Sequence, residues 1–231
     1  AFTNARVITM NSARDVIDNG VVIVEDNRIV ALGATGDVSI PDGARQVDLA
    51  GKTLMPGYID AHAHGPYGRD DIIPQNNWSL LAHLALGVTT VHNPSSRAAQ
   101  VFPAAEYQRA GKIIGPRIFS TGEIIYGAKS TGFDPIESLD DAKAVVDRLK
   151  AQGAISVKNY NQPRRAQRQM VIEAARDAGM LVVAEGGSLY NMDMNLLIPN
   201  KTPLWTTLSI EMDTLLLIAN KLLLNSSTSS L

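Results

Sequence analysis

The sequence predicts an α/β protein in which a small strand-rich region precedes a parallel sheet covered by helices. Two observations support this prediction. Short β-rich runs joined by polar turns fill residues 1–54, and from Leu54 onward short apolar segments alternate with helical segments. Such alternation is typical of a parallel sheet with right-handed crossover connections.

The N-terminal region contains a clear hairpin signal. Residues 20–33 form two β-rich runs on either side of a polar turn at Glu25-Asp26-Asn27. A further short run at residues 46–49 is followed by a turn at Gly51-Lys52. We therefore interpret residues 1–54 as part of a small antiparallel sheet.

The following region contains repeated strand–helix units. Strands are expected at residues 55–60, 88–92, 117–121, 155–160 and 180–185, and helices near 78–86, 97–110, 139–152 and 164–178. Ser138-Leu-Asp-Asp141 has the form of a capping box, and Gly153 and Gly179 stand where C′ glycines belong. A closed (β/α)₈ barrel needs eight such units. The sequence therefore predicts an incomplete (β/α)₈ barrel of the TIM type over residues 55–195.

The alternation stops after Gly187. Residues 196–231 are rich in leucine, contain no glycine and end in a Ser/Thr-rich stretch. We interpret this tail as foreign to the preceding domain, as a frameshifted or truncated end would be. The alternative is an ordinary C-terminal helix near residues 208–224 that packs on the core.

Composition excludes several classes of function. The formal net charge of -2 gives no basic field for nucleic acid or an anionic membrane surface. The chain has no cysteine, which excludes disulfides and thiolate zinc sites. We expect a small-molecule substrate, no nucleic-acid partner and no membrane partner. A homo-oligomer is compatible with the sequence, and the compartment stays open.

A pair of histidines follows the first expected strand of the βα region. His62 and His64 are two residues apart, so on a strand both side chains would point to the same side. Two imidazoles at the carboxyl end of a strand can share one metal ion, and barrel active sites are built at that end. His-x-His alone is a weak signal, but its position after Met-Pro-Gly-Tyr-Ile-Asp strengthens it.

Residues around this pair resemble the amidohydrolase superfamily. Residues 48–64 are similar to the entry of the barrel in that family, and Leu86-Gly-Val-Thr-Thr-Val-His92 is similar to its second strand. The resemblance covers about residues 1–195. It implies a β-sandwich beside a (β/α)₈ barrel, with His62 and His64 as metal ligands. Residues 157–165 and 185–187 resemble the corresponding segments of a bacterial subgroup. In that subgroup the amidohydrolase domain follows a Tol-type β-propeller in the chain.

The resemblance also implies further metal ligands. Lys158 stands where many members carry a lysine that reacts with CO₂ and bridges two metals as a carbamate. That reaction requires a neutral amine, which burial favours; the alternative is a lysine that reaches solvent. Glu185 replaces the histidine that most relatives have after the fifth strand, and it could ligate zinc through oxygen. We expect one or two divalent ions, zinc first among them.

Three further side chains are candidates for substrate contact. His92 ends the second strand, where it could contact substrate. A structural role, as a hydrogen-bonded histidine in the wall of the fold, is an equal alternative. Tyr126 and Tyr160 follow the third and fourth strands, where packing is the competing explanation. His83 lies within an expected helix and is assigned a structural role.

The resemblance implies hydrolysis of a C–N bond (an amide, a cyclic amide or a peptide-like bond) by metal-activated water. In the family an aspartate after the eighth strand takes the proton, and a histidine from the sixth strand binds metal; neither is recognisable here. The chain by itself is therefore expected to be weakly active or inactive. The alternatives are another bond, such as a phosphoester, a non-catalytic structural or interaction module, and a metal-free binding protein for a small ligand.

Overall fold

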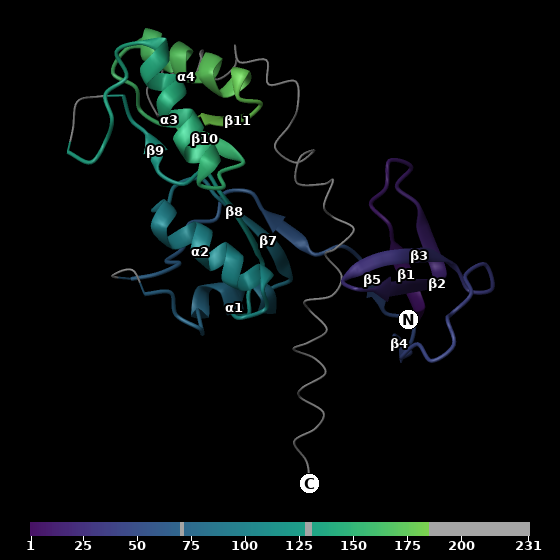
Figure 1. Cartoon of the computed structure of the whole chain (residues 1–231). Coiled ribbons are helices and arrows are strands. Elements are labelled where there is room, and N and C mark those ends of the chain that lie inside the picture. Colours follow the sequence, from purple (N-terminus) through teal and green to yellow (C-terminus); the bar gives the residue numbers. More distant parts are fainter. Residues whose placement is uncertain (70–71, 128–130, 185–231) are drawn as a thin grey trace. The chain divides into compact units, whose positions relative to one another are not determined.

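The computed structural model describes residues 1–69, 72–127 and 131–184, which form two compact units (Figure 1). The first unit ends at Tyr58 and the second begins at Ile59. The chain is a mixed α/β protein, as the sequence predicted. Glu185 and the tail at residues 196–231 lie outside the described residues, and the domain boundaries at residues 54 and 195 stay predictions.

The N-terminal unit is built on a five-stranded sheet. Its strands are β1 (Phe2–Ile8), β2 (Val16–Glu25), β3 (Arg28–Ala34), β4 (Val47–Asp48) and β5 (Thr53–Leu54). The order is β3-β2-β1-β4, with β5 also paired to β1. The first three strands are antiparallel, whereas β4 and β5 run parallel to β1. The purely antiparallel sheet expected from the sequence is therefore wrong, because a longer connection after β3 returns the chain in the direction of β1.

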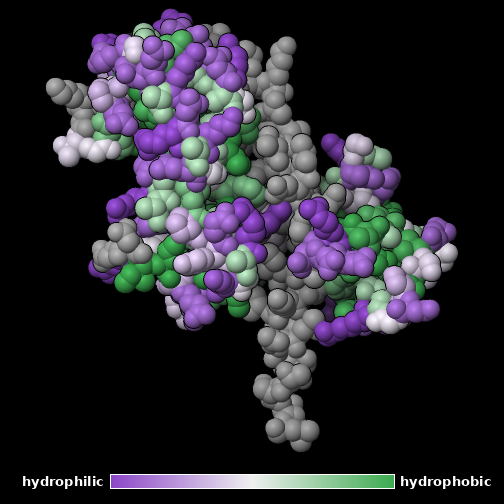
Figure 2. All heavy atoms as spheres, viewed as in Figure 1, coloured by the Kyte–Doolittle hydropathy of each residue, from purple (hydrophilic) through white to green (hydrophobic). Residues whose placement is uncertain are grey.

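The expected hairpin is present between β2 and β3. Its two turn residues, Asp26 and Asn27, both have positive φ, 46° and 65°. Positive φ at both central positions is typical of the tight turns that match the twist of paired strands, and Asn and Asp tolerate it best after glycine. Figure 2 shows hydrophobic residues gathered over this sheet, and Val16, Val30 and Leu32 are among the exposed ones.

The described residues from Tyr58 onward form two three-stranded sheets. They comprise β6 (Tyr58–Asp60), β7 (Val88–Asn93) and β8 (Arg117–Ser120), and then β9 (Ile124–Ile125), β10 (Ser156–Asn159) and β11 (Leu181–Ala184). All five expected strands are present, four of them shorter than predicted and β7 one residue longer, whereas β9 was not expected. The pairs β7–β8, β9–β10 and β10–β11 are parallel.

The two sheets are joined by one continuous segment. The chain from β8 to β9 pairs with β7 at its start and with β10 at its end. Between them Gly122 has φ +68°, and a Cβ there would lie 3.2 Å from a Leu149 methyl group. The strands therefore follow one another in space in the order in which they occur in the chain, without the reversal of a doubly wound sheet.

Four helices cover these strands, and all four were expected. They are α1 (Trp78–Ala85), α2 (Ala98–Arg109), α3 (Leu139–Ala151) and α4 (Arg165–Asp177). The buried side chains of α3 and α4 form one core with Val157 of β10, and those of α2 form another with Val91 and Ile118. Within the described part of the chain, no helix combines the length and hydropathy needed to cross a membrane.

The sequence signals at the helix ends are confirmed. Ser138 Oγ accepts the Asp141 N–H, and the Asp141 carboxylate accepts the Ser138 N–H at 2.8 Å, which completes the capping box. Gly153 and Gly179 follow the C-caps of α3 and α4 with φ of 108° and 68°. These two glycines end their helices in the left-handed conformation that other residues adopt at a cost.

We expect Ser138→Ala to lower the free energy of unfolding by about 1 kcal/mol, because the first turn of α3 loses its side-chain acceptor. Urea denaturation measures this change. Ser138→Asp is the matched control, since aspartate can accept the same N–H and should retain most of the stability. Equal stability of Ser138→Ala and the unchanged protein would contradict the assignment of this cap.

Candidate functional site

His62 and His64 lie directly after β6 with their rings side by side. The ring centroids are 5.0 Å apart and the ring planes are inclined by 75°. The sequence analysis expected the pair on the strand itself. The strand ends at Asp60, so the pair lies in the following loop instead. Both histidines are exposed, whereas Ala63 between them is buried and donates its N–H to the His92 carbonyl at 2.9 Å. The loop is thus anchored to β7 while both imidazoles face outward.

Asp60 fixes the start of this loop, a role that the sequence analysis missed. One carboxylate oxygen accepts the His62 N–H at 3.0 Å, and the other lies 3.8 Å from Nε2 of His83. Nδ1 of His83 lies 2.7 Å from the Ser79 carbonyl, one turn earlier in α1. His83 therefore has the structural role expected of it.

His92 is fully buried, with both ring nitrogens hydrogen-bonded. Nδ1 lies 3.2 Å from the Ala61 carbonyl, and Nε2 lies 2.8 Å from Ser156 Oγ. Since a carbonyl only accepts, Nδ1 carries the proton and Nε2 accepts from the serine hydroxyl. These contacts favour the alternative of a wall histidine, and substrate contact by His92 stays a prediction.

The surroundings of His92 keep it neutral. Burial lowers the pKa of His92 from 6.5 to about 4, against the opposing effect of the Ala61 hydrogen bond. The positive charges of His62 and Lys158 lower this pKa further. His92 is hydrogen-bonded to Ala61, the neighbour of His62, and to Ser156, two residues before Lys158 on β10, so the three side chains belong to one region.

This low pKa predicts a pH-dependent stability. Between pH 6.5 and about 4 the unfolded chain binds a proton at His92 that the folded chain does not. Stability should therefore fall as the pH falls through this window, by about 3 kcal/mol in total. Urea denaturation of the metal-free protein at pH 7 and pH 4 measures the loss, and His92→Gln should reduce it. An unchanged pH dependence in that variant would contradict the assignment.

Lys158 is buried in β10 beneath an aromatic cluster. It is 1% exposed, and its Nζ lies 6.0 Å from the centre of the Tyr160 ring. The Tyr160 and Tyr126 rings lie edge to face at 6.4 Å, and the Tyr126 and Phe133 rings at 5.6 Å. The alternative of a lysine that reaches solvent is therefore wrong. Substrate contact by Tyr126 and Tyr160 stays a prediction.

A buried amide network holds the loop that carries Tyr126. Oε1 of Gln162 accepts the Gly127 N–H at 2.7 Å, and its Nε2 donates to the Ile125 carbonyl at 2.7 Å. Gln167 donates to the Gly127 carbonyl at 2.8 Å. A Cβ at Gly127 would lie 2.5 Å from the Gln162 amide oxygen, so any other residue there would displace this amide. Sequence reasoning missed these glutamines, although Gln162 lies in the segment 157–165 that carried the resemblance.

Tyr67 is a second residue that sequence reasoning missed. It follows the histidine pair and is 3% exposed. Burial raises the pKa of its hydroxyl, a hydrogen bond with Asn93 lowers it, and the negative charge of Asp60 raises it. Tyr67 therefore links the loop after β6 to the end of β7. Its position three residues after His64 was the one feature of the sequence that could have marked it as a site residue.

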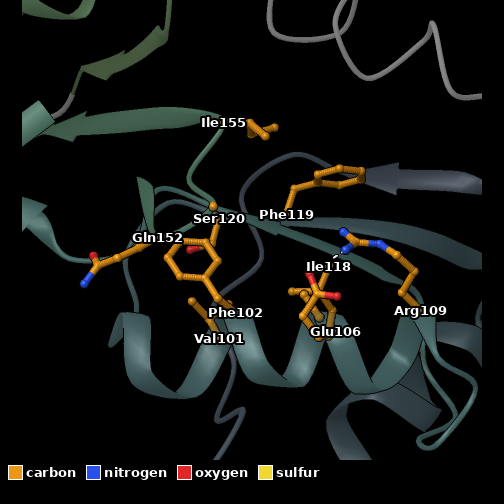
Figure 3. A pocket seen from close by; sticks show the side chains of 11 residues that line it. Val101, Phe102, Glu106, Arg109, Ile118, Phe119, Ser120, Gln152 and Ile155 are labelled. Atoms are coloured by element: carbon orange, nitrogen blue, oxygen red, sulfur yellow. Dashed lines mark hydrogen bonds and ion pairs between the residues drawn. The ribbon is translucent and has the colours of Figure 1, made fainter. Parts of the chain in front are cut away.

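The described residues also enclose a small cavity of about 210 Å³ between α2, β8 and the chain before β10 (Figure 3). Its wall includes the ion pair of Glu106 and Arg109 and the ring of Phe102. None of the expected site residues lines it. This cavity is therefore separate from the histidine pair.

The described residues only partly match the donor set of a metal centre. They contain no cluster of three or more His, Asp or Glu side chains that could hold an ion. The two exposed imidazoles after β6 do fit a divalent metal, and a carbamate on Lys158 would add anionic oxygens to them. Glu185, the fourth expected ligand, lies outside the described residues.

Known proteins resemble part of this chain in sequence. A 5-methylthioadenosine/S-adenosylhomocysteine deaminase from Bacillus thuringiensis (strain Al Hakam) is 33% identical over 63 residues, which is 27% of this chain and 14% of the relative. The enzyme of the same name from Symbiobacterium thermophilum is 41% identical over 58 residues, 25% of this chain and 13% of the relative. No family model matches the chain.

Solved structures resemble a larger part of it. A putative prolidase from Bifidobacterium longum superposes with a TM-score of 0.66 at 23% identity, over 85% of this chain and 51% of that one. Phenylurea hydrolase B superposes with a TM-score of 0.63 at 21% identity, over 85% of this chain and 57% of that one. A bottromycin amidohydrolase superposes with a TM-score of 0.62 at 20% identity, over 88% of this chain and 45% of that one. The chain spans about half the length of these structures. The relatives found by sequence and by structure are members of the amidohydrolase superfamily, and the chain shares the mixed α/β fold of about half of each of these solved structures.

Proposed function

We propose that this chain supplies the first part of a divalent-metal centre in a hydrolase that cleaves a C–N bond. One observation carries the proposal: two exposed imidazoles stand side by side at the carboxyl end of β6, in the region that also holds the buried Lys158. The relatives are hydrolases or deaminases by name, which supports the same reaction class. The substrate is a small molecule with an amide, cyclic amide or peptide-like bond.

Each candidate ligand has an assigned role. His62 and His64 bind the first ion, Lys158 joins two ions as a carbamate, and Glu185 binds the second ion in place of histidine. Zinc suits nitrogen and carboxylate donors in such a set. A divalent ion held there would supply Lewis acidity and a nucleophilic water near neutral pH.

The surrounding residues position these groups. Asp60 accepts the His62 N–H and so fixes the loop from which both imidazoles project. His92 stays neutral and adds no positive charge beside the ion. Tyr160 lies beside Lys158 and packs against Tyr126, and both tyrosines would contact the substrate. These units belong to an incomplete barrel over residues 55–195, preceded by part of a β-sandwich over residues 1–54.

A hydrolysis assay with a matched pair of variants tests this function. The zinc-loaded protein is incubated with N-acetyl amino acids and dipeptides, and the released amine is measured. Because this chain by itself is expected to be weakly active at most, we expect slow metal-dependent release that is lost in His64→Asn. His83→Asn is the control, because it removes a histidine outside the pair. Equal turnover in chelator-treated and zinc-loaded protein would contradict the proposal.

A further inference from the structure

The connection between β6 and α1, which carries His62 and His64, also forms an open pocket of about 470 Å³. This volume lies within the range of small-molecule sites in proteins. The pocket is lined by residues that follow the histidine pair: Pro66, Gly68, Arg69, Ile72, Pro74, Asn76, Asn77, Trp78 and Ser79.

Large apolar side chains are exposed in this pocket. Trp78 is 83% exposed and Ile72 is 70% exposed, the former at the first position of α1. Pro66 and Pro74 add further apolar lining. An exposed tryptophan beside an exposed isoleucine and two prolines is typical of a surface that another apolar group covers.

The wall of the pocket is held by specific hydrogen bonds. Asn77 is 7% exposed; its side-chain oxygen accepts the N–H groups of Ser79 and Leu80, and its amide donates to the Pro66 carbonyl at 2.7 Å. Arg69 and Ile72 exchange backbone hydrogen bonds of 2.9 Å. The pocket therefore exists without a ligand, which reduces the entropic cost of binding.

The pocket begins close to the histidine pair along the chain, since Pro66, two residues after His64, is part of its lining. Gly65 follows His64 directly, and a Cβ at Gly65 would lie 3.5 Å from Ser79 Oγ, which lines the pocket. In βα folds the loops after the strands supply both the reacting groups and the contacts that select the substrate. A group bound against Trp78 would therefore belong to the same molecule that reaches the histidines.

We propose that this pocket binds an aromatic or branched aliphatic group of the substrate, while the C–N bond lies at the His62–His64 side. The inference rests on the proposed function and adds the substrate class: amides that carry a large apolar substituent. Ile72 and Trp78 are the residues that select this substituent.

Tryptophan fluorescence tests the pocket without requiring metal or turnover. The chain has two tryptophans, so a Trp205→Phe background leaves Trp78 as the single reporter. Metal-free protein is titrated with N-(phenylacetyl)glycine and, separately, with N-acetylglycine. We expect a saturable blue shift with the first probe only, and a roughly tenfold weaker affinity in Ile72→Ser. Ile114→Ser is the control, because Ile114 is 53% exposed and lies outside the pocket.

The outcomes separate this inference from the proposed function. Equal responses to both probes, or an unchanged affinity in Ile72→Ser, would overturn the apolar subsite. A blue shift that depends on protein concentration without probe, and disappears in Ile72→Ser, would identify a second copy as the occupant and also overturn it. Selective binding of the phenylacetyl probe by a protein that takes up no zinc would support the subsite and contradict the metal centre.

Discussion

Replacing His62 and His64 together with alanine is expected to weaken zinc binding by at least about 100-fold, because the site loses both of its imidazole nitrogen donors. The two rings lie 5.0 Å apart on an anchored loop, so little rearrangement is needed for both to reach one ion. Competition titration with a chromophoric zinc chelator measures the affinity. Because both side chains are exposed, the metal-free variant should keep its stability.

His83→Ala is the matched control for this experiment. It removes an imidazole from α1 that lies 3.8 Å from Asp60 and outside the exposed pair. We expect its zinc affinity to stay within a few-fold of that of the unchanged protein. Loss of zinc in His83→Ala together with retention in the double variant would contradict the assignment of the ligands.

Lys158→Met is expected to abolish the part of metal binding that depends on bicarbonate while leaving the fold intact. Lys158 is 1% exposed, and methionine is a flexible side chain of similar length that can fill its place in the core. If the lysine forms a carbamate, protein prepared with ¹³C-bicarbonate and zinc should show a carbamate carbon signal by NMR. That signal should be absent in the variant.

Lys112→Met provides a matched control for the lysine. Lys112 also lies over a tyrosine ring, with its Nζ 5.7 Å from the centre of Tyr107, but at an exposed position after α2. Its replacement should leave both the carbamate signal and zinc uptake unchanged. A carbamate signal that persists in Lys158→Met would show that another amine is carboxylated.

Local rules account for the parts of the fold that the sequence predicted. Hydrophobic periodicity placed all four helices within one or two residues of their bounds, and Ser138 and Gly153 marked the ends of α3. The turn at Asp26-Asn27 was also predictable, because these residues tolerate the positive φ that a tight hairpin requires. Such signals depend on neighbouring residues alone.

Features that depend on distant residues were not predicted. The parallel pairing of β4 and β5 with β1, and the short strand β9 beside β10, depend on chain crossings rather than on local pattern. The same reason applies to the site. The spacing of His62 and His64 predicted that their side chains would lie together, although they lie after β6 and not on it. The Ser156 partner of His92 was not predicted, because it is 64 residues away.

Elemental analysis of the purified chain tests the metal centre most directly, with the His62→Ala/His64→Ala variant prepared in parallel. The proposed centre predicts near-stoichiometric zinc or another divalent metal in the unchanged chain and only trace metal in the variant. An absence of metal from both, after reconstitution with zinc and bicarbonate, would contradict it and would favour a non-catalytic role for these residues.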